Sequence, residues 1–176
     1  MGWKHRNSKR KRHFAFNRRR NAKRPDTIIP DVEITQEALE TLRTYRQIEG
    51  AERPGVMVGS VIGENKYRIN RISPPLVKGN ASHTGCERDG EAANAYVLSQ
   101  YELSEHTRIY LGEWHTHPED EPIPSGRDIS SIMEISCLPD MCLPFVILCI
   151  IGRTGNYWGA IVNNELHDLK VHILPY

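Results

Sequence analysis

The chain has few cysteines, and it lacks both a paired-cysteine motif and a long apolar run. Its four cysteines show no CxxC spacing, so neither a disulfide framework nor a closed cysteine zinc site is predicted from Cys86, Cys137, Cys142 and Cys149. No segment approaches the roughly 18 consecutive apolar residues of a membrane span, and the N-terminal residues contain no apolar stretch typical of a secretion signal. We therefore expect a cytoplasmic protein that does not bind membranes.

Acidic residues are absent from the first 24 positions, which makes the charge of the chain strongly asymmetric. Residues 1–24 hold 11 of the 23 Lys and Arg residues and none of the 22 Asp and Glu residues, so 12 basic and 22 acidic side chains remain elsewhere, a formal charge of −10. A segment this basic cannot bury enough apolar surface to order itself. We predict a disordered basic arm over residues 1–25 and one folded domain over residues 26–176.

Two interpretations of the basic arm stay open. Its charge suits electrostatic binding to nucleic acid or to an acidic protein surface, and aromatic residues among the charges favour such binding: Trp3, Phe14 and Phe16. A solvated tail without a partner fits the composition equally well.

The first candidate site is the sequence HTHP at residues 115–118, at the end of an expected strand over residues 107–115. Residues two apart in a strand point to the same face. We therefore expect one side of this strand to carry Ile109, Leu111, Glu113, His115 and His117. Two imidazoles placed in this way can bind one metal ion, and the proline after them indicates that a loop follows.

A serine and an aspartate come after this loop. Ser125 is an expected helix N-cap, which places Asp128 in the first turn, at the positive end of the helix. With His115 and His117, Asp128 gives three ligands of the kind that bind zinc. Catalytic zinc has three protein ligands and keeps a position for water, whereas structural zinc is closed by four ligands. The pattern therefore predicts one catalytic zinc ion per chain.

A carboxylate upstream provides the base that such a site needs. Glu52 precedes the apolar run GVMVGSVI, an expected buried strand, so its side chain would lie at the strand's entrance. We predict that Glu52 takes a proton from the attacking water. The role of Glu113 is open, because it could point into the site or pair with Arg88 or Arg127.

Three motifs occur together in a fixed order: ExxGxxxG at residues 52–59, HxHP at residues 115–118, and SxxD at residues 125–128, with seven residues between the second histidine and the serine. Taken singly, SxxD is usually a helix cap and HxH is common. Their joint occurrence resembles the JAMM motif of JAB/MPN-domain zinc metalloproteases.

This resemblance implies a role for each matching residue. His115, His117 and Asp128 would bind the zinc ion. Glu52 would be the catalytic acid and base, and Ser125 would help to stabilise the tetrahedral oxyanion.

The segment GEWHTHPEDEPIPSGRD, with CERDGEAANAYVLSQY before it, further resembles a prokaryotic branch of the family that is found with mobile elements and antiphage defence operons, CBASS systems among them. That resemblance implies an enzyme that cleaves the bond between the C-terminus of a ubiquitin-like protein and its target. The protein with this C-terminus could also be one that is conjugated in the same fashion. The alternatives are a peptidase that processes sulfur-carrier or ubiquitin-like precursors and a non-catalytic MPN interaction module.

The apolar periodicity predicts an α/β domain in the order αββαβαβββ, with a mixed β-sheet flanked by helices as in the MPN fold. After an extended linker over residues 24–34, helices are expected at residues 35–48, at 89–103 and from Ser125. Strands are expected at residues 56–62, 66–73, 107–115, 144–152, 157–163 and 168–174. Loops 76–88 and 136–144 are expected to form the walls of a substrate groove.

Overall fold

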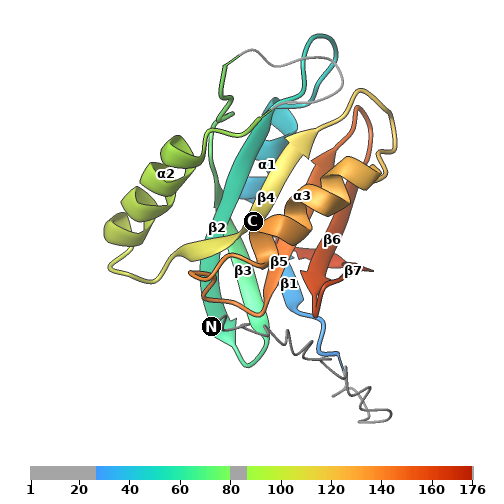
Figure 1. Cartoon of the computed structure of the whole chain (residues 1–176). Helices are drawn as coiled ribbons and strands as arrows, with labels where there is room; N and C mark the ends of the chain where they lie inside the picture. The colour runs from blue at the N-terminus through green and yellow to red at the C-terminus, as the bar shows by residue number, and fades with distance from the viewer. Residues whose placement is uncertain (1–26, 80–86, 176) are drawn as a thin grey trace, which may run out of the picture.

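The computed structural model describes residues 27–79 and 87–175, so the predicted basic arm lies outside the described residues. These residues form an eight-stranded mixed sheet with the order β7-β6-β5-β4-β2-β3-β1-β8, together with three helices (Figure 1). The strands are β1 (Asp31–Ile34), β2 (Pro54–Gly63), β3 (Lys66–Ile72), β4 (Ile109–Thr116), β5 (Phe145–Ile151), β6 (Asn156–Val162), β7 (Glu165–Asp168) and β8 (Val171–Ile173). The helices are α1 (Gln36–Thr44), α2 (Gly90–Leu103) and α3 (Gly126–Ser136), and none in this part of the chain is long and apolar enough to cross a membrane.

Two helices cover opposite faces of the sheet (Figure 1). α1 packs on the larger core, to which it contributes Ala38, Leu39 and Leu42. α3 packs on the other face, where Ile132 joins alternate residues of β5 and Ile161 of β6. α2 lies beside β2 and β4 and buries only Ala93. Because β5 is covered on both faces, all seven of its residues are buried, as its continuous apolar sequence predicts.

The predicted fold class is confirmed, but three details of the predicted helices and strands are wrong. Residues 31–34 form a strand rather than a linker, since β1 pairs in parallel with both β3 and β8. α1 ends at Thr44, where Tyr45 caps it and stacks on Trp114 with ring centroids 5.1 Å apart, and Ile48 is exposed instead of helical. The strand expected at residues 168–174 is the shorter β8, and an unexpected strand, β7, ends just before it; the amide of Leu169 between them donates to the carbonyl of Trp158.

The break between β7 and β8 determines the shape of the sheet. β7 pairs with β6 at one edge and β8 pairs with β1 at the other edge. Only residues 169–170 join these two strands. So short a connection between opposite edges requires the sheet to curl until its edges come close together.

A bulge in β4 separates side chains that the sequence pattern places on one side. Ile109 and Leu111 pack with Trp114 in the core beneath α1, whereas Glu113 and His115 line a cleft on the α3 face. The prediction that all of them share a face is therefore wrong for the first two. The pairing of β4 with β2 shifts register at Leu111, and such a bulge reverses the alternation of side chains.

The close approach of β4 to β5 gives a first prediction. A Cβ atom on Gly112 would lie 2.0 Å from the carbonyl oxygen of Ile147, so Gly112→Ala must push the two strands apart. We expect the free energy of unfolding, measured in urea, to fall by about 1–3 kcal/mol or more. Gly90→Ala is the control, since no atom lies within 4 Å of its added Cβ. Equal loss of stability in both variants would contradict the prediction.

Candidate metal centre

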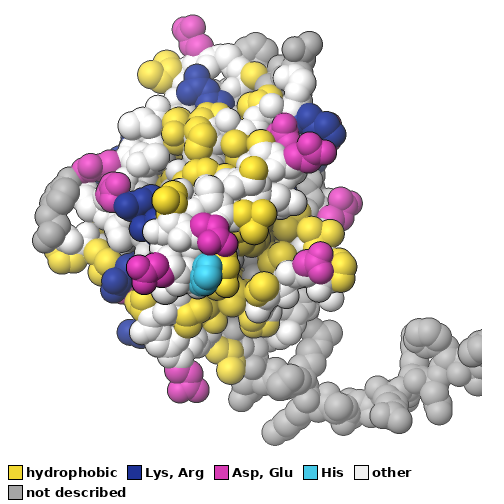
Figure 2. All heavy atoms as spheres, turned by 90° about the vertical axis from the view of Figure 1, so that its left-hand side faces the viewer, with side chains coloured by type: hydrophobic (Ala, Val, Ile, Leu, Met, Phe, Trp, Pro, Cys, Tyr) yellow, Lys and Arg dark blue, Asp and Glu magenta, His cyan; other side chains and the backbone are white. Residues whose placement is uncertain are grey.

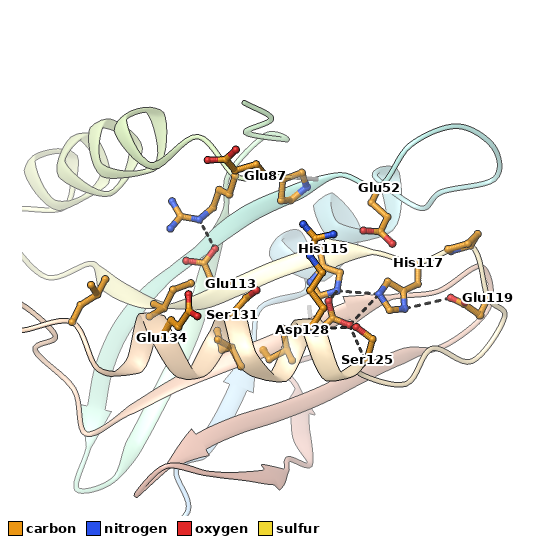
Figure 3. Close-up of a pocket in the computed structure, with 18 residues that line it drawn as sticks. Glu52, Glu87, Glu113, His115, His117, Glu119, Ser125, Asp128, Ser131 and Glu134 are labelled. Carbon is orange, nitrogen blue, oxygen red and sulfur yellow. Dashed lines mark hydrogen bonds and ion pairs between the residues drawn. The ribbon is translucent and has the colours of Figure 1, made fainter. Parts of the chain in front are cut away.

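Three side chains from β4, the residue after it and α3 converge on one point (Figure 3). The Nε2 atoms of His115 and His117 lie 3.2 Å apart. Asp128 places Oδ1 3.2 Å from His115 Nε2 and Oδ2 3.5 Å from His117 Nε2. The structure therefore brings together the three predicted ligands, whose ligand atoms all lie within 4.8 Å of one another.

These separations fit a zinc ion. Ligand atoms about 2.0–2.2 Å from a tetrahedral zinc lie about 3.3–3.6 Å from each other, close to the distances seen here. Two Nε2 atoms at such a distance direct their lone pairs at each other unless one is protonated, and a cation between them removes this conflict. Among the described residues no fourth His, Cys, Asp or Glu joins the cluster.

Asp128 is held by the helix that carries it. The Ser125 amide donates to Asp128 Oδ2 over 2.7 Å, and the Asp128 amide donates to Ser125 Oγ over 3.2 Å, a capping box that confirms Ser125 as the N-cap. Burial alone would raise the pKa of Asp128, but hydrogen bonds from His115, His117 and Ser125 hold it well below its usual range. The carboxylate is therefore ionised and suited to a cation.

Glu52 lies in the loop before β2 and lines the same cleft. Its carboxylate points toward the two histidines (Figure 3). Burial raises the pKa of Glu52 above its ordinary value, and the charges of His117 and His115 partly offset this effect. A raised pKa makes a carboxylate a stronger proton acceptor, which suits a general base.

A buried network that the sequence does not reveal fixes the Glu52 loop to the histidine strand. Thr116 is fully buried, and its hydroxyl accepts from the Arg53 amide over 3.0 Å and donates to Gln47 Oε1 over 3.0 Å. The Gln47 amide group in turn donates to the Gly50 carbonyl over 2.6 Å. Thr116 lies between the two histidines in sequence, so its side chain points away from the cleft. Its hydrogen bonds therefore fix the Glu52 loop on the opposite face of the strand.

The open question about Glu113 is settled in favour of Arg88. Glu113 Oε2 lies 2.7 Å from Arg88 Nε, and Glu113 Oε1 accepts from the Tyr110 hydroxyl over 2.6 Å. Burial raises the pKa of Glu113, while Arg88 and Tyr110 lower it. Glu113 thus fixes Arg88 in the wall of the cleft and is not part of the group formed by His115, His117 and Asp128.

The cleft has a volume of about 790 Å³ and extends from Glu52 along α3 to Leu138. Glu87 and Arg88 form part of the opposite wall, so both loops expected to form walls contribute residues to it. Residues 80–86 of the first loop lie outside the described residues. Figure 2 looks onto the side of the molecule that carries α2, where apolar and charged side chains are mixed.

Similarity to known proteins shows the family to which this chain belongs. A family model described as prokaryotic homologs of the JAB domain matches residues 35–165. The chain belongs to this family of prokaryotic JAB-domain proteins, as its motifs predict. The solution structure of a protein from Desulfitobacterium hafniense supports the same fold, with a TM-score of 0.59, 15% identity and coverage of 82% of this chain and 94% of that one.

Closer similarity is found to curated proteins named CD-NTase/cGAS isopeptidase. The relative from Escherichia coli (strain TW11681) is 35% identical over 142 residues, which cover 79% of this chain and 87% of the relative. Those from Vibrio cholerae and Pseudomonas aeruginosa are 35% and 33% identical, over 71% and 70% of this chain and 78% of each relative. The family match begins after the basic arm, so nucleic-acid binding by residues 1–24 gains no support.

The buried Thr116 network gives a second prediction. Thr116→Val keeps the side-chain volume but leaves the Arg53 amide and Gln47 Oε1 without their partner in a buried place. We expect the free energy of unfolding in urea to fall by about 1–3 kcal/mol. Thr107→Val removes an exposed hydroxyl that donates to the Ser104 carbonyl, and it should change stability by about 0.5 kcal/mol at most. A Thr116→Val protein as stable as this control would show that the network contributes little.

Proposed function

We propose that this protein is a zinc-dependent isopeptidase that releases a CD-NTase, or a protein conjugated in the same ubiquitin-like fashion, from its target in an antiphage system. The observation that carries the proposal is the convergence of His115, His117 and Asp128 in one open cleft that Glu52 also lines. The name shared by the similar proteins supports the substrate class. We propose a cytoplasmic site of action, in line with the sequence.

The residues of the cleft supply the steps of amide hydrolysis. His115, His117 and Asp128 would hold a zinc ion, which when bound would supply Lewis acidity that lowers the pKa of water to about 7. Glu52 takes a proton from the water molecule that attacks the scissile carbonyl carbon. When the carbon–nitrogen bond breaks, Glu52 returns this proton to the leaving amine, so that the products are an amine and a carboxylic acid, which loses its remaining proton to the solvent at neutral pH.

We propose that Ser125 stabilises the oxyanion. Its Oγ accepts the amide hydrogen bond of Asp128, which leaves its own hydroxyl proton to be donated into the cleft that Ser125 lines. A donor aimed at the position where negative charge develops lowers the barrier to acyl transfer.

The cleft suits an extended C-terminal segment of a substrate. It is bounded by α3 on one side and by residues 87–88 on the other, and its far end is apolar at Ile135 and Leu138. Arg88 is held in this wall by Glu113, so it offers a fixed positive charge to the substrate chain. We propose that the C-terminal tail lies along this path, with its scissile bond between Glu52 and the histidines.

Zinc content and cleavage, measured on the same preparations, test the assigned roles. Glu52→Gln should keep one zinc ion per chain but lose about 100- to 10,000-fold in cleavage rate, because the amide cannot carry the proton. Asp128→Ala should lose the zinc ion. Glu49→Gln, the same change at an exposed position three residues away, should keep both properties. Normal cleavage by Glu52→Gln would show that the base is wrongly assigned.

The type of bond can be tested with two matched substrates. Both carry the same C-terminal segment of a CD-NTase, joined in one to a lysine side chain and in the other to the α-amine of a following residue. We expect a higher kcat/KM for the lysine-linked substrate. A preference for the linear substrate would favour a precursor-processing peptidase, and no cleavage of either by zinc-loaded protein would favour a non-catalytic module.

A further inference from the structure

The two nitrogens of the His117 ring face different carboxylates. Nε2 faces Asp128 and the Nε2 atom of His115, on the side where the ligand atoms gather. Nδ1 lies 3.3 Å from Oε2 of Glu119, on the opposite side of the ring (Figure 3). The ring therefore lies between the ligand cluster and a carboxylate outside it.

We infer that Glu119 is a positioning residue that fixes the tautomer and orientation of His117 for metal binding, an inference that rests on the metal site of the proposed function. A neutral imidazole carries a proton on one nitrogen and a lone pair on the other. A carboxylate at Nδ1 retains the proton there, so the lone pair of Nε2 is free for the ion. Such an outer partner also raises the basicity of the ligand.

The neighbouring turn between β5 and β6 fixes the backbone of Glu119. The Arg153 amide donates to the Glu119 carbonyl over 2.7 Å, and the amides of Thr154 and Gly155 donate to the Asp120 carbonyl over 3.1 and 2.9 Å. The Asp120 carboxylate also accepts from Arg153 Nε over 2.9 Å. The side chain of Glu119 is 59% exposed, so the structural support that Glu119 receives comes through its backbone.

This backbone support depends on a close approach of two backbones. A Cβ atom on Gly152 would lie 2.6 Å from the Asp120 carbonyl oxygen and 2.8 Å from that of Glu119. The His117 amide donates to the Ile151 carbonyl over 2.9 Å, so the same segment also holds the ligand itself. His117 and Glu119 are thus fixed relative to each other by one turn.

Zinc affinity, measured by competition with a chromophoric chelator, tests the inference on the full chain. We expect Glu119→Ala to bind zinc about tenfold more weakly than wild type, at the low end of the range for outer-shell partners. Glu119→Gln keeps an acceptor without the charge, and its loss should be smaller. Glu134→Ala removes the same charge from another exposed glutamate of the cleft, and its affinity should equal that of wild type.

The nitrogen-15 spectrum of the zinc-loaded protein gives a second readout that a purely structural role would not change. In wild type we expect His117 Nδ1 to be protonated, and its proton should exchange faster with water in Glu119→Ala. Equal zinc affinity of Glu119→Ala and Glu134→Ala, or an unchanged Nδ1 signal, would overturn the role inferred for Glu119 but would leave the proposed function standing. A folded wild-type protein that binds no zinc would overturn the proposed function itself.

Discussion

The alternation of side chains along the last residues of β4 is the constraint on which the site depends. Trp114 packs in the core beneath α1 and the buried Thr116 bonds Gln47, whereas Glu113 and His115 face the cleft. Trp114 stacks on Tyr45 at the end of α1, so aromatic packing fixes β4 on the face opposite to the cleft. Because one strand serves both faces, any shift of the core moves His115 and the residues that follow it as well.

The features of the fold and the site that could be predicted from the sequence are those that depend on residues close together in the chain. Ser125 and Asp128 are three residues apart and satisfy each other's backbone amides, so their geometry follows from a helix cap alone. The meeting of these residues with His115 was predictable from motif spacing, and the buried strand β5 from its apolar run. The fold class also followed, because the period of the apolar residues distinguishes helices from strands.

The parts that could not be predicted depend on partners far away in the sequence. β1 is only four residues long, and it is a strand because β3 and β8 flank it. The contact between Gln47 and Thr116 joins residues 69 positions apart, and no local pattern indicates it. The bulge at Leu111 likewise reflects the pairing of β4 with β2. Glu119 follows His117 by two residues, which the sequence does show. Its backbone position beside His117 depends on the turn after β5, which the sequence does not show.

The curl of the sheet also bears on how the folded protein behaves among other chains. Sheet edges expose unpaired backbone groups that can pair with strands of another molecule, and short edge strands limit this hazard. In the described part of the chain the edge strands are β7 and β8, of four and three residues, while the long strands lie inside the sheet. The fold therefore keeps its most apolar strands away from edge-to-edge aggregation while the cleft stays open.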